Sequence, residues 1–273
     1  MRQFVGVVVL AAVVFSALGA RAQSDSGVGI VVLKEHGVGS PALAQPYLDR
    51  FVAMAAEEND WVSASGRYFT SRPAAEAFIQ AQKPHYGIFS LAAFLALKEK
   101  YHFEVIGQVA VSLVGGRQYA LISKTATSLA ECKGNPLASD HVDDPRFIER
   151  VVAAGQFKLA DFKLEPTQRP LQTIKKVLSD EVLCALVDDA QVAELSHIEG
   201  ADGVRTVWKS AELPPMAVVA FPSAPTAERK KFQDKLDDVC DHNEHGVCGE
   251  VGIVSLHLAS AADYGAVLMA YGK

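Results

Sequence analysis

The sequence predicts an α/β protein built as two lobes, and three observations lead to this prediction. Short runs rich in β-branched residues alternate with helical segments along most of the chain, which is typical of α/β architectures rather than of β-sandwiches or helix bundles. The glycine pair Gly115-Gly116 interrupts this alternation between two strands, where a chain can change direction or domain. A further strand follows Pro214-Pro215, which suggests that the chain returns to its first half.

The first half opens with a strand over 27–33, which ends in a glycine-containing loop over 34–39. Ser40 and Pro41 then supply an N-cap and a proline at the first helical position, so we expect a helix that extends to about Glu58. The elements expected next are a strand over 61–64, a helix over 72–82, a strand over 86–89, a helix over 91–101 and a strand over 103–112.

The same alternation continues beyond the glycine pair. The expected elements are a strand over 118–123, a helix near 129, a strand over 136–139, a helix over 145–154, a strand over 162–165, a helix over 170–178, strands over 182–187, 204–208 and 216–221, and helices over 224–239 and 261–269. These assignments place residues 23–113 and 214–273 in one lobe and residues 114–213 in the other, with a hinge between them.

The N-terminus has the composition of a cleavable secretory signal. A positive charge at Arg2 precedes an apolar run from Phe4 to Leu18, and the small residues Ala20 and Ala22 occupy the positions that a signal peptidase recognises for cleavage after Ala22. The alternative is a membrane anchor, but a spanning helix needs about 20 apolar residues. We therefore expect residues 1–22 to be removed and the mature chain to reside in the periplasm.

Composition and charge make nucleic acid an improbable partner. The formal net charge is −6, and loss of Arg2 and Arg21 with the signal peptide lowers it to −8. No basic run is present that could follow a phosphate backbone. The longest later apolar stretch, 91–97, is too short to cross a bilayer.

The cysteine count favours disulfides. The four cysteines of the mature chain allow three connectivities in an oxidising compartment. We favour Cys240 with Cys248, which are close in sequence, and hence Cys132 with Cys184. The alternative is a zinc site over 240–248, where two thiols and two imidazoles occur together, although their spacing matches no structural zinc pattern.

Three stretches of the chain resemble a known family. Residues 86–94 (YGIFSLAAF), 128–140 (SLAECKGNPLASD) and 185–190 (ALVDDA) resemble the type 2 periplasmic substrate-binding proteins of ABC transporters, and within them the phosphate- and phosphonate-binding branch. This resemblance implies two lobes, each a mixed β-sheet flanked by helices, which close on a small solute and deliver it to an ABC permease of the inner membrane. It also implies that the second lobe is inserted into the first.

One turn departs from the phosphonate-binding pattern. Where those proteins usually carry a hydroxyl-rich turn that holds an oxyanion, this chain has Asp140, His141, Val142, Asp143 and Asp144 before a proline. Three carboxylates would repel a phosphate. We therefore expect a small ligand that has diverged from phosphate or phosphonate.

Ligands of open α/β sheets bind outside the carboxyl ends of the strands, so the loops at those ends supply the candidate ligand-binding residues. The first lobe contributes His36, Ser40, Tyr68, Phe69, Thr70 and Ser90, and the second contributes Asp140, His141, Gln168, Arg169, Asp188 and Asp189.

Each candidate also has a structural interpretation. Ser40, Ser90, Asp143 or Asp144, and one of Asp188 and Asp189 are in positions suited to helix caps. Arg169 could be a solvated or ion-paired surface residue, and Tyr68 and Phe69 could pack in the core.

The hypothesis we favour is a monomeric transport receptor that is not an enzyme and needs no cofactor or metal ion. The sequence contains no Gly-x-Ser-x-Gly elbow, no His-Glu-x-x-His and no phosphate-binding glycine loop. Two alternatives remain open. One is a sensor, or a carrier of an apolar or lipid ligand, on the same fold. The other is an enzyme in which His36, His141 and Asp188 act as acids or bases.

Overall fold

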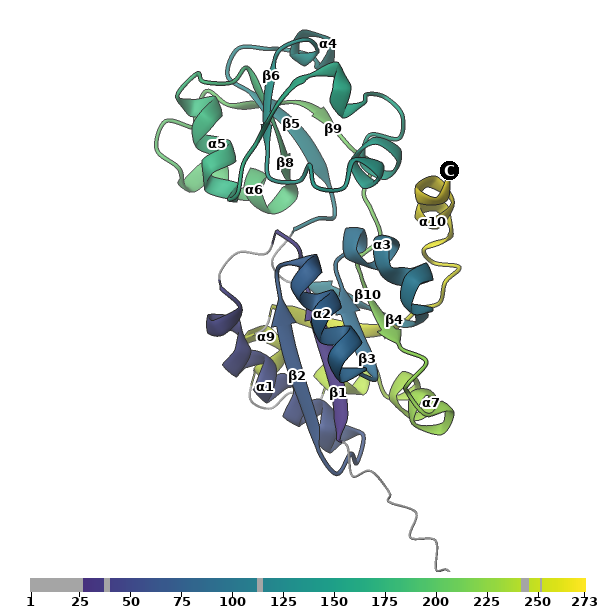
Figure 1. Ribbon diagram of the computed structural model, residues 1–273. Helices are drawn as coiled ribbons and strands as arrows, with labels where there is room; N and C mark the ends of the chain where they lie inside the picture. Colours follow the sequence, from purple (N-terminus) through teal and green to yellow (C-terminus); the bar gives the residue numbers. More distant parts are fainter. Residues whose placement is uncertain (1–26, 37–39, 112–114, 242–245, 251) are drawn as a thin grey trace, which may run out of the picture.

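The computed structural model describes residues 27–36, 40–111, 115–241, 246–250 and 252–273. These residues form two α/β lobes, each built around its own mixed sheet (Figure 1). The predicted signal peptide, residues 1–22, lies outside the described residues.

A six-stranded sheet forms the first lobe. Its strands are β1 (Val28–Leu33), β2 (Ala64–Phe69), β3 (Tyr86–Phe89), β4 (Glu104–Val111), β10 (Met216–Ala220) and β11 (Ile253–Leu258), in the order β11-β4-β10-β3-β1-β2. β1 is parallel to both β2 and β3, whereas β10 is antiparallel to both β3 and β4. Because β10 follows the whole second lobe in sequence, that lobe is an insertion between β4 and β10.

Helices cover both faces of this sheet, as the alternation of apolar side chains on β1 requires. Val31 and Leu33 pack with residues of α2 (Arg72–Gln82) and α3 (Leu91–Tyr101). Ile30 packs on the opposite face, which is covered by α1 (Pro41–Glu58), α7 (Thr226–Asp234), α8 (Asp238–Asp241) and α9 (Val247–Glu250). No helix in the described ranges combines the length and the apolarity needed to cross a bilayer.

A five-stranded sheet forms the second lobe. Its strands are β5 (Tyr119–Ser123), β6 (Pro136–Ser139), β7 (Lys163–Pro166), β8 (Cys184–Asp188) and β9 (Arg205–Lys209), in the order β7-β6-β8-β5-β9. α5 (Pro170–Leu178) and α6 (Asp189–Glu194) lie on one face, and the π-helix η1 (Phe147–Val152) packs on the other. The shorter elements are α4 (Leu129–Cys132), η2 (Leu159–Asp161) and η3 (Leu195–His197).

Two chain segments and one helix join the lobes. The segments leading into β5 and out of β9 hydrogen-bond to each other, with the Leu213 N–H donating to the Arg117 carbonyl (2.7 Å) and the Arg117 Nε donating to the Leu213 carbonyl (2.6 Å). The C-terminal helix α10 (Gly265–Gly272) lies beside the junction (Figure 1) and contacts η1 of the second lobe.

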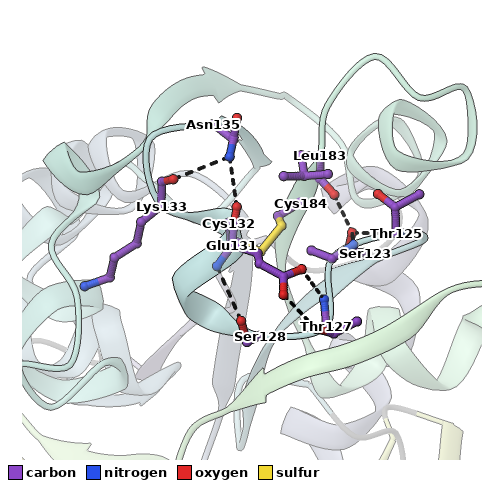
Figure 2. The surroundings of a disulfide bond; sticks show 11 residues. Ser123, Thr125, Thr127, Ser128, Glu131, Cys132, Lys133, Asn135, Leu183 and Cys184 are labelled. Atoms are coloured by element: carbon purple, nitrogen blue, oxygen red, sulfur yellow. Dashed lines mark hydrogen bonds between the residues drawn. A yellow bond between two sulfur atoms is a disulfide. The ribbon is translucent and has the colours of Figure 1, made fainter.

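The structure joins Cys132 to Cys184 and Cys240 to Cys248. The first disulfide ties α4 to the start of β8, close to the hydrogen bonds that hold the turn before α4 (Figure 2). The second ties α8 to α9 beneath the first sheet. Because both sulfurs of the 240–248 segment are disulfide-bonded, they are not available as zinc-binding thiolates.

The strand expected over 61–64 was placed too early, because β2 runs from Ala64 to Phe69. The aromatic Trp61 does not enter the sheet but stacks on Tyr86 and packs against Phe232 of α7. Gly66 explains why β2 can lie directly under α1. A Cβ at this position would lie 2.7 Å from Cγ2 of Val52.

Two further expectations were wrong in the C-terminal part and one in the second lobe. The helix expected over 224–239 divides into α7, which ends at Asp234, and the short α8. Strand β11 was not predicted, and it extends the sheet by pairing antiparallel with β4. The helix expected over 145–154 contains the π-helical turns of η1.

Candidate functional site

The carboxyl ends of the parallel strands in both lobes point into the junction between the lobes. In the first lobe, β1 leads into Glu35 and His36, and β3 leads into Ser90. In the second lobe, β6 leads directly into Asp140 and His141. This is the edge at which α/β proteins place their ligands.

A buried polar network fixes the side chains at the end of β6. Gln191 of α6 donates from Nε2 to Oδ1 of Asp140 (3.1 Å), and Thr173 of α5 donates to the same oxygen (2.8 Å). The Gln191 carbonyl accepts from the backbone N–H of Asp188 (3.0 Å) and lies 2.7 Å from Nε2 of His141. An amide oxygen only accepts hydrogen bonds, so Nε2 of His141 carries the hydrogen and Nδ1 is the unprotonated nitrogen of the neutral ring.

An ion-pair network links the two lobes beside this cluster. The Arg72 guanidinium donates two hydrogen bonds to Glu35 of its own lobe (2.7 and 2.9 Å) and one to Asp144 of the second lobe (3.2 Å). The Tyr271 hydroxyl of α10 also donates to Asp144 (3.0 Å). Burial by itself lowers the pKa of Arg72, but the hydrogen bonds and charges of Glu35 and Asp144 outweigh it and raise the pKa. The guanidinium is therefore a permanent cation between two carboxylates.

His36 brings the first lobe into contact with the polar network. Its ring lies edge-on to that of His141, with 4.7 Å between the ring centroids, and its Nε2 is 3.6 Å from a carboxylate oxygen of Asp143. Burial lowers the pKa of His36, as does the neighbouring His141, against the opposing effect of Asp143, Asp140 and Glu35. One potential ligand atom from each of His36, Asp140 and His141 lies within 4.8 Å of the others.

Two cavities flank Tyr119, the first residue of β5. The smaller has a volume of about 10 Å³ and lies between the lobes, where His36, Arg72, His141 and Asp143 contribute to its wall. The larger, of about 570 Å³, lies beside the linkers on the second-lobe side. Its wall is formed by Val111, Arg117, Gln118, Tyr119, Ala120, Asp189, Val192, Ala193, Thr206, Lys209 and Glu212.

Asp189 is the predicted residue that reaches the larger cavity. Its carboxylate accepts a hydrogen bond from the backbone N–H of Arg117 (3.2 Å). Burial raises its pKa, and the charge of Asp188 raises it further. The Tyr119 hydroxyl is buried at the same place, and burial followed by the charges of Asp188 and Asp189 raises its pKa well above the usual value.

The structure brings together only part of the predicted set. His36, Asp140, His141, Asp188 and Asp189 meet at the junction of the lobes, and Ser90 joins them indirectly because its hydroxyl accepts from the Glu35 N–H (3.4 Å). Asp188 also caps α6, as one of its two interpretations predicted.

The other predicted residues lie elsewhere. Ser40 is the exposed N-cap of α1, and Gln168 and Arg169 are exposed at the start of α5. Tyr68 and Phe69 lie on opposite faces of β2 and pack against the two apolar clusters of the first lobe, and Thr70 follows them in a bend; none of these three residues lines either cavity.

Sequence reasoning missed several residues of this region. Gln191 could have been found, because Asp188 and Gln191 have the spacing of a capping box, which places both at a strand end followed by a helix. Tyr119, Glu35 and Arg72 carry no comparable signal. Their roles depend on how the two lobes are placed, which local sequence does not encode.

No protein-family model and no curated protein matches this sequence. Solved structures do match. The protein XAC2383 from Xanthomonas citri bound to ATP has a TM-score of 0.68 at 10% identity, covering 89% of this chain and 96% of the other. PhnD1 from Prochlorococcus marinus in complex with methylphosphonate has a TM-score of 0.65 at 11% identity, covering 88% and 95%. A binding protein component of an ABC phosphonate transporter from Pseudomonas aeruginosa has a TM-score of 0.64 at 13% identity, covering 88% and 84%.

These likenesses define a class by fold. The chain has the two-lobed α/β fold of the type 2 periplasmic binding proteins, as its sequence motifs suggested. Within that class, phosphonate-binding proteins are among the structures that resemble it.

Proposed function

We propose that this protein is the exported solute-binding component of an ABC-type transport system and that it holds a small organic solute beside the hinge. The observation that carries the proposal is the larger cavity. Its volume of about 570 Å³ lies within the range of roughly 300 to 1,000 Å³ that small-molecule sites occupy. It adjoins the two linkers, so a solute bound there would contact the segments that must bend when the lobes move.

The chemistry of the cavity favours a solute with both a polar and an apolar part. Val111, Val192 and Ala193 supply apolar surface, and Gln118 supplies an amide. Arg117 is already bound to Glu212 and to the Leu213 carbonyl, whereas Lys209 forms no ion pair among the described residues. Lys209 is therefore the cation that a solute anion could meet.

A phosphonate is not the solute that we propose, in contrast to the relatives of similar fold. At the equivalent turn, Asp140, Asp143 and Asp144 face the junction, and the guanidinium of Arg72 is already bound by two carboxylates. An added dianion would meet net negative charge there. We also propose that binding occurs without catalysis, because Ser139 and Thr173 direct their hydroxyls to the Leu186 carbonyl and to Asp140 rather than to His141.

A thermal-shift screen of the mature protein tests this proposal, since a ligand that binds only the native state raises Tm. The panel should contain methylphosphonate, alkylsulfonates, amino acids and ATP, and mass spectrometry should identify any molecule that co-purifies. We expect at least one solute to raise Tm, and we expect Gln118→Ala and Lys209→Ala to reduce that shift. Lys163→Ala, on exposed β7 of the same lobe, is the control.

Two results would contradict the proposal. One is a panel in which no solute changes Tm and no molecule co-purifies. The other is a shift that is unchanged in both cavity variants, because the solute would then bind elsewhere.

A further inference from the structure

The smaller cavity is of the wrong size for an organic solute. Its volume of about 10 Å³ is roughly that of one water-sized sphere. It lies where Glu35, His36 and Arg72 of the first lobe meet His141 and Asp143 of the second. A single ion or a single water molecule is the largest occupant that this arrangement accommodates.

Two buried polar atoms at this place have no hydrogen-bond partner among the described residues. They are Nδ1 of His141 and Oδ2 of Asp140, on side chains that are only 4% and 3% exposed. Leaving such an atom unsatisfied costs about 1 to 3 kcal/mol. The network described above leaves both atoms unprotonated, because Gln191 holds the hydrogen of His141 on Nε2 and Thr173 and Gln191 both donate to Asp140. Two lone pairs are thus buried side by side without a donor.

The charges around the cavity favour a cation. Glu35, Asp143 and Asp144 contribute carboxylates in addition to Asp140, and Arg72 is the one guanidinium that the wall contains among the described residues. Its charge is divided between Glu35 and Asp144. A divalent cation would therefore enter a region of net negative charge, which lowers its energy.

We propose that His36, Asp140 and His141 bind one divalent transition-metal ion between the two lobes. Two imidazole nitrogens and one carboxylate oxygen are the donor set that suits zinc and its neighbours, whereas magnesium and calcium require oxygen ligands almost throughout. Gln191 is a positioning residue, because its hydrogen bond to Nε2 turns the free nitrogen of His141 into the ligand. Asp143, 3.6 Å from His36, is available as a fourth ligand.

The metal would draw the two lobes together. Its ligands come from both of them, His36 following β1 and the other two following β6. The three ligand atoms lie within 4.8 Å of one another, whereas bonds of about 2 Å to a tetrahedral zinc ion place ligand atoms about 3.3 Å apart. Binding therefore requires an approach of about 1 Å or more, which movement at the hinge can supply. This inference concerns the ion alone and holds whether or not an organic solute occupies the larger cavity.

Isothermal titration of the chelator-treated mature protein with zinc chloride, with no organic solute present, tests the site. We expect one zinc ion per chain, and we expect His36→Ala and His141→Ala each to weaken binding at least about tenfold. The control is the double variant His242→Ala/His245→Ala, which removes the two imidazoles of the 240–248 segment and should leave the affinity unchanged. Since His36 is partly exposed, His36→Ala is the variant that decides the outcome if His141→Ala does not fold.

Small-angle scattering tests the bridging of the lobes. Zinc should reduce the radius of gyration of the wild-type protein and leave that of His36→Ala unchanged, because the remaining ligands lie in one lobe. Absence of zinc binding, or equal affinity in wild type and His36→Ala, would overturn the site, and binding without a change in radius would overturn the bridging. A Tm shift with an organic solute in the presence of chelator reports on the proposed transport function separately.

Discussion

The Arg72 ion pairs are the strongest polar connection between the lobes that the structure shows, and replacing Arg72 by alanine tests what they contribute. The variant removes three charge-assisted hydrogen bonds, two to Glu35 and one to Asp144. It leaves the carboxylates of Glu35 (8% exposed) and Asp144 (12% exposed) near each other without a cation. The loss therefore includes both the missing bonds and the repulsion between the remaining charges.

The magnitude follows from the burial of the three groups. Removing one partner of a fully buried ion pair costs about 3 to 5 kcal/mol. The Arg72 side chain is 24% exposed, so solvent screens part of this interaction. We expect Arg72→Ala to lower the free energy of unfolding by about 2 to 3 kcal/mol. Added salt should reduce the difference only slightly, because buried pairs are screened less than exposed ones.

Urea denaturation of the mature protein measures this quantity. The two tryptophans lie in different lobes, Trp61 in the first and Trp208 in the second, so coincident transitions by fluorescence and circular dichroism establish whether the lobes unfold together. Lys230→Ala is the control, because it removes an exposed ion pair to Asp234 one helical turn away. Its expected cost is about 0.3 to 0.5 kcal/mol. If Arg72→Ala costs no more than this control, the connection between the lobes is not electrostatic and the reasoning is wrong.

Three further predictions concern the framework around the site. The Cys132–Cys184 disulfide closes a segment of 52 residues, so replacing both cysteines by alanine should lower stability by about 4 kcal/mol in urea, and an unchanged midpoint would contradict this role. Burial lowers the pKa of His85, whose Nδ1 accepts a backbone N–H of β1. The unfolded state then binds a proton that the folded state does not, so stability should fall as the pH drops below about 6.5. Urea titrations at two pH values should show a smaller fall for His85→Asn, and an equal fall would exclude His85 as the cause. Gly66→Ala should cost about 1 to 3 kcal/mol because α1 must move away from β2, whereas Gly203→Ala, with no atom near the added methyl group, should be tolerated. Similar midpoints for the two glycine variants would refute the close packing.

The sequence by itself determined the class of fold and most of its elements. Alternating apolar runs identified β1, β3, β4, β6, β8 and β10 to within a few residues, because strands buried by helices on both faces require them. It also identified Asp140, His141 and Asp189, since the polar residues that follow such strands must lie at one edge of the sheet.

Only the tertiary structure decided which of these residues meet. His36 and His141 are 105 positions apart and belong to different lobes, and their contact depends on the placement of the lobes, which a hinge sets. Arg72 and Asp144 are brought together by the same placement. Tyr68 and Phe69 show the converse, because a strand alternates its side chains between two faces and both faces of β2 are covered by helices. Local patterns report the neighbours of a residue along the chain, whereas a site between lobes is made of residues whose proximity is set by packing over long distances in sequence.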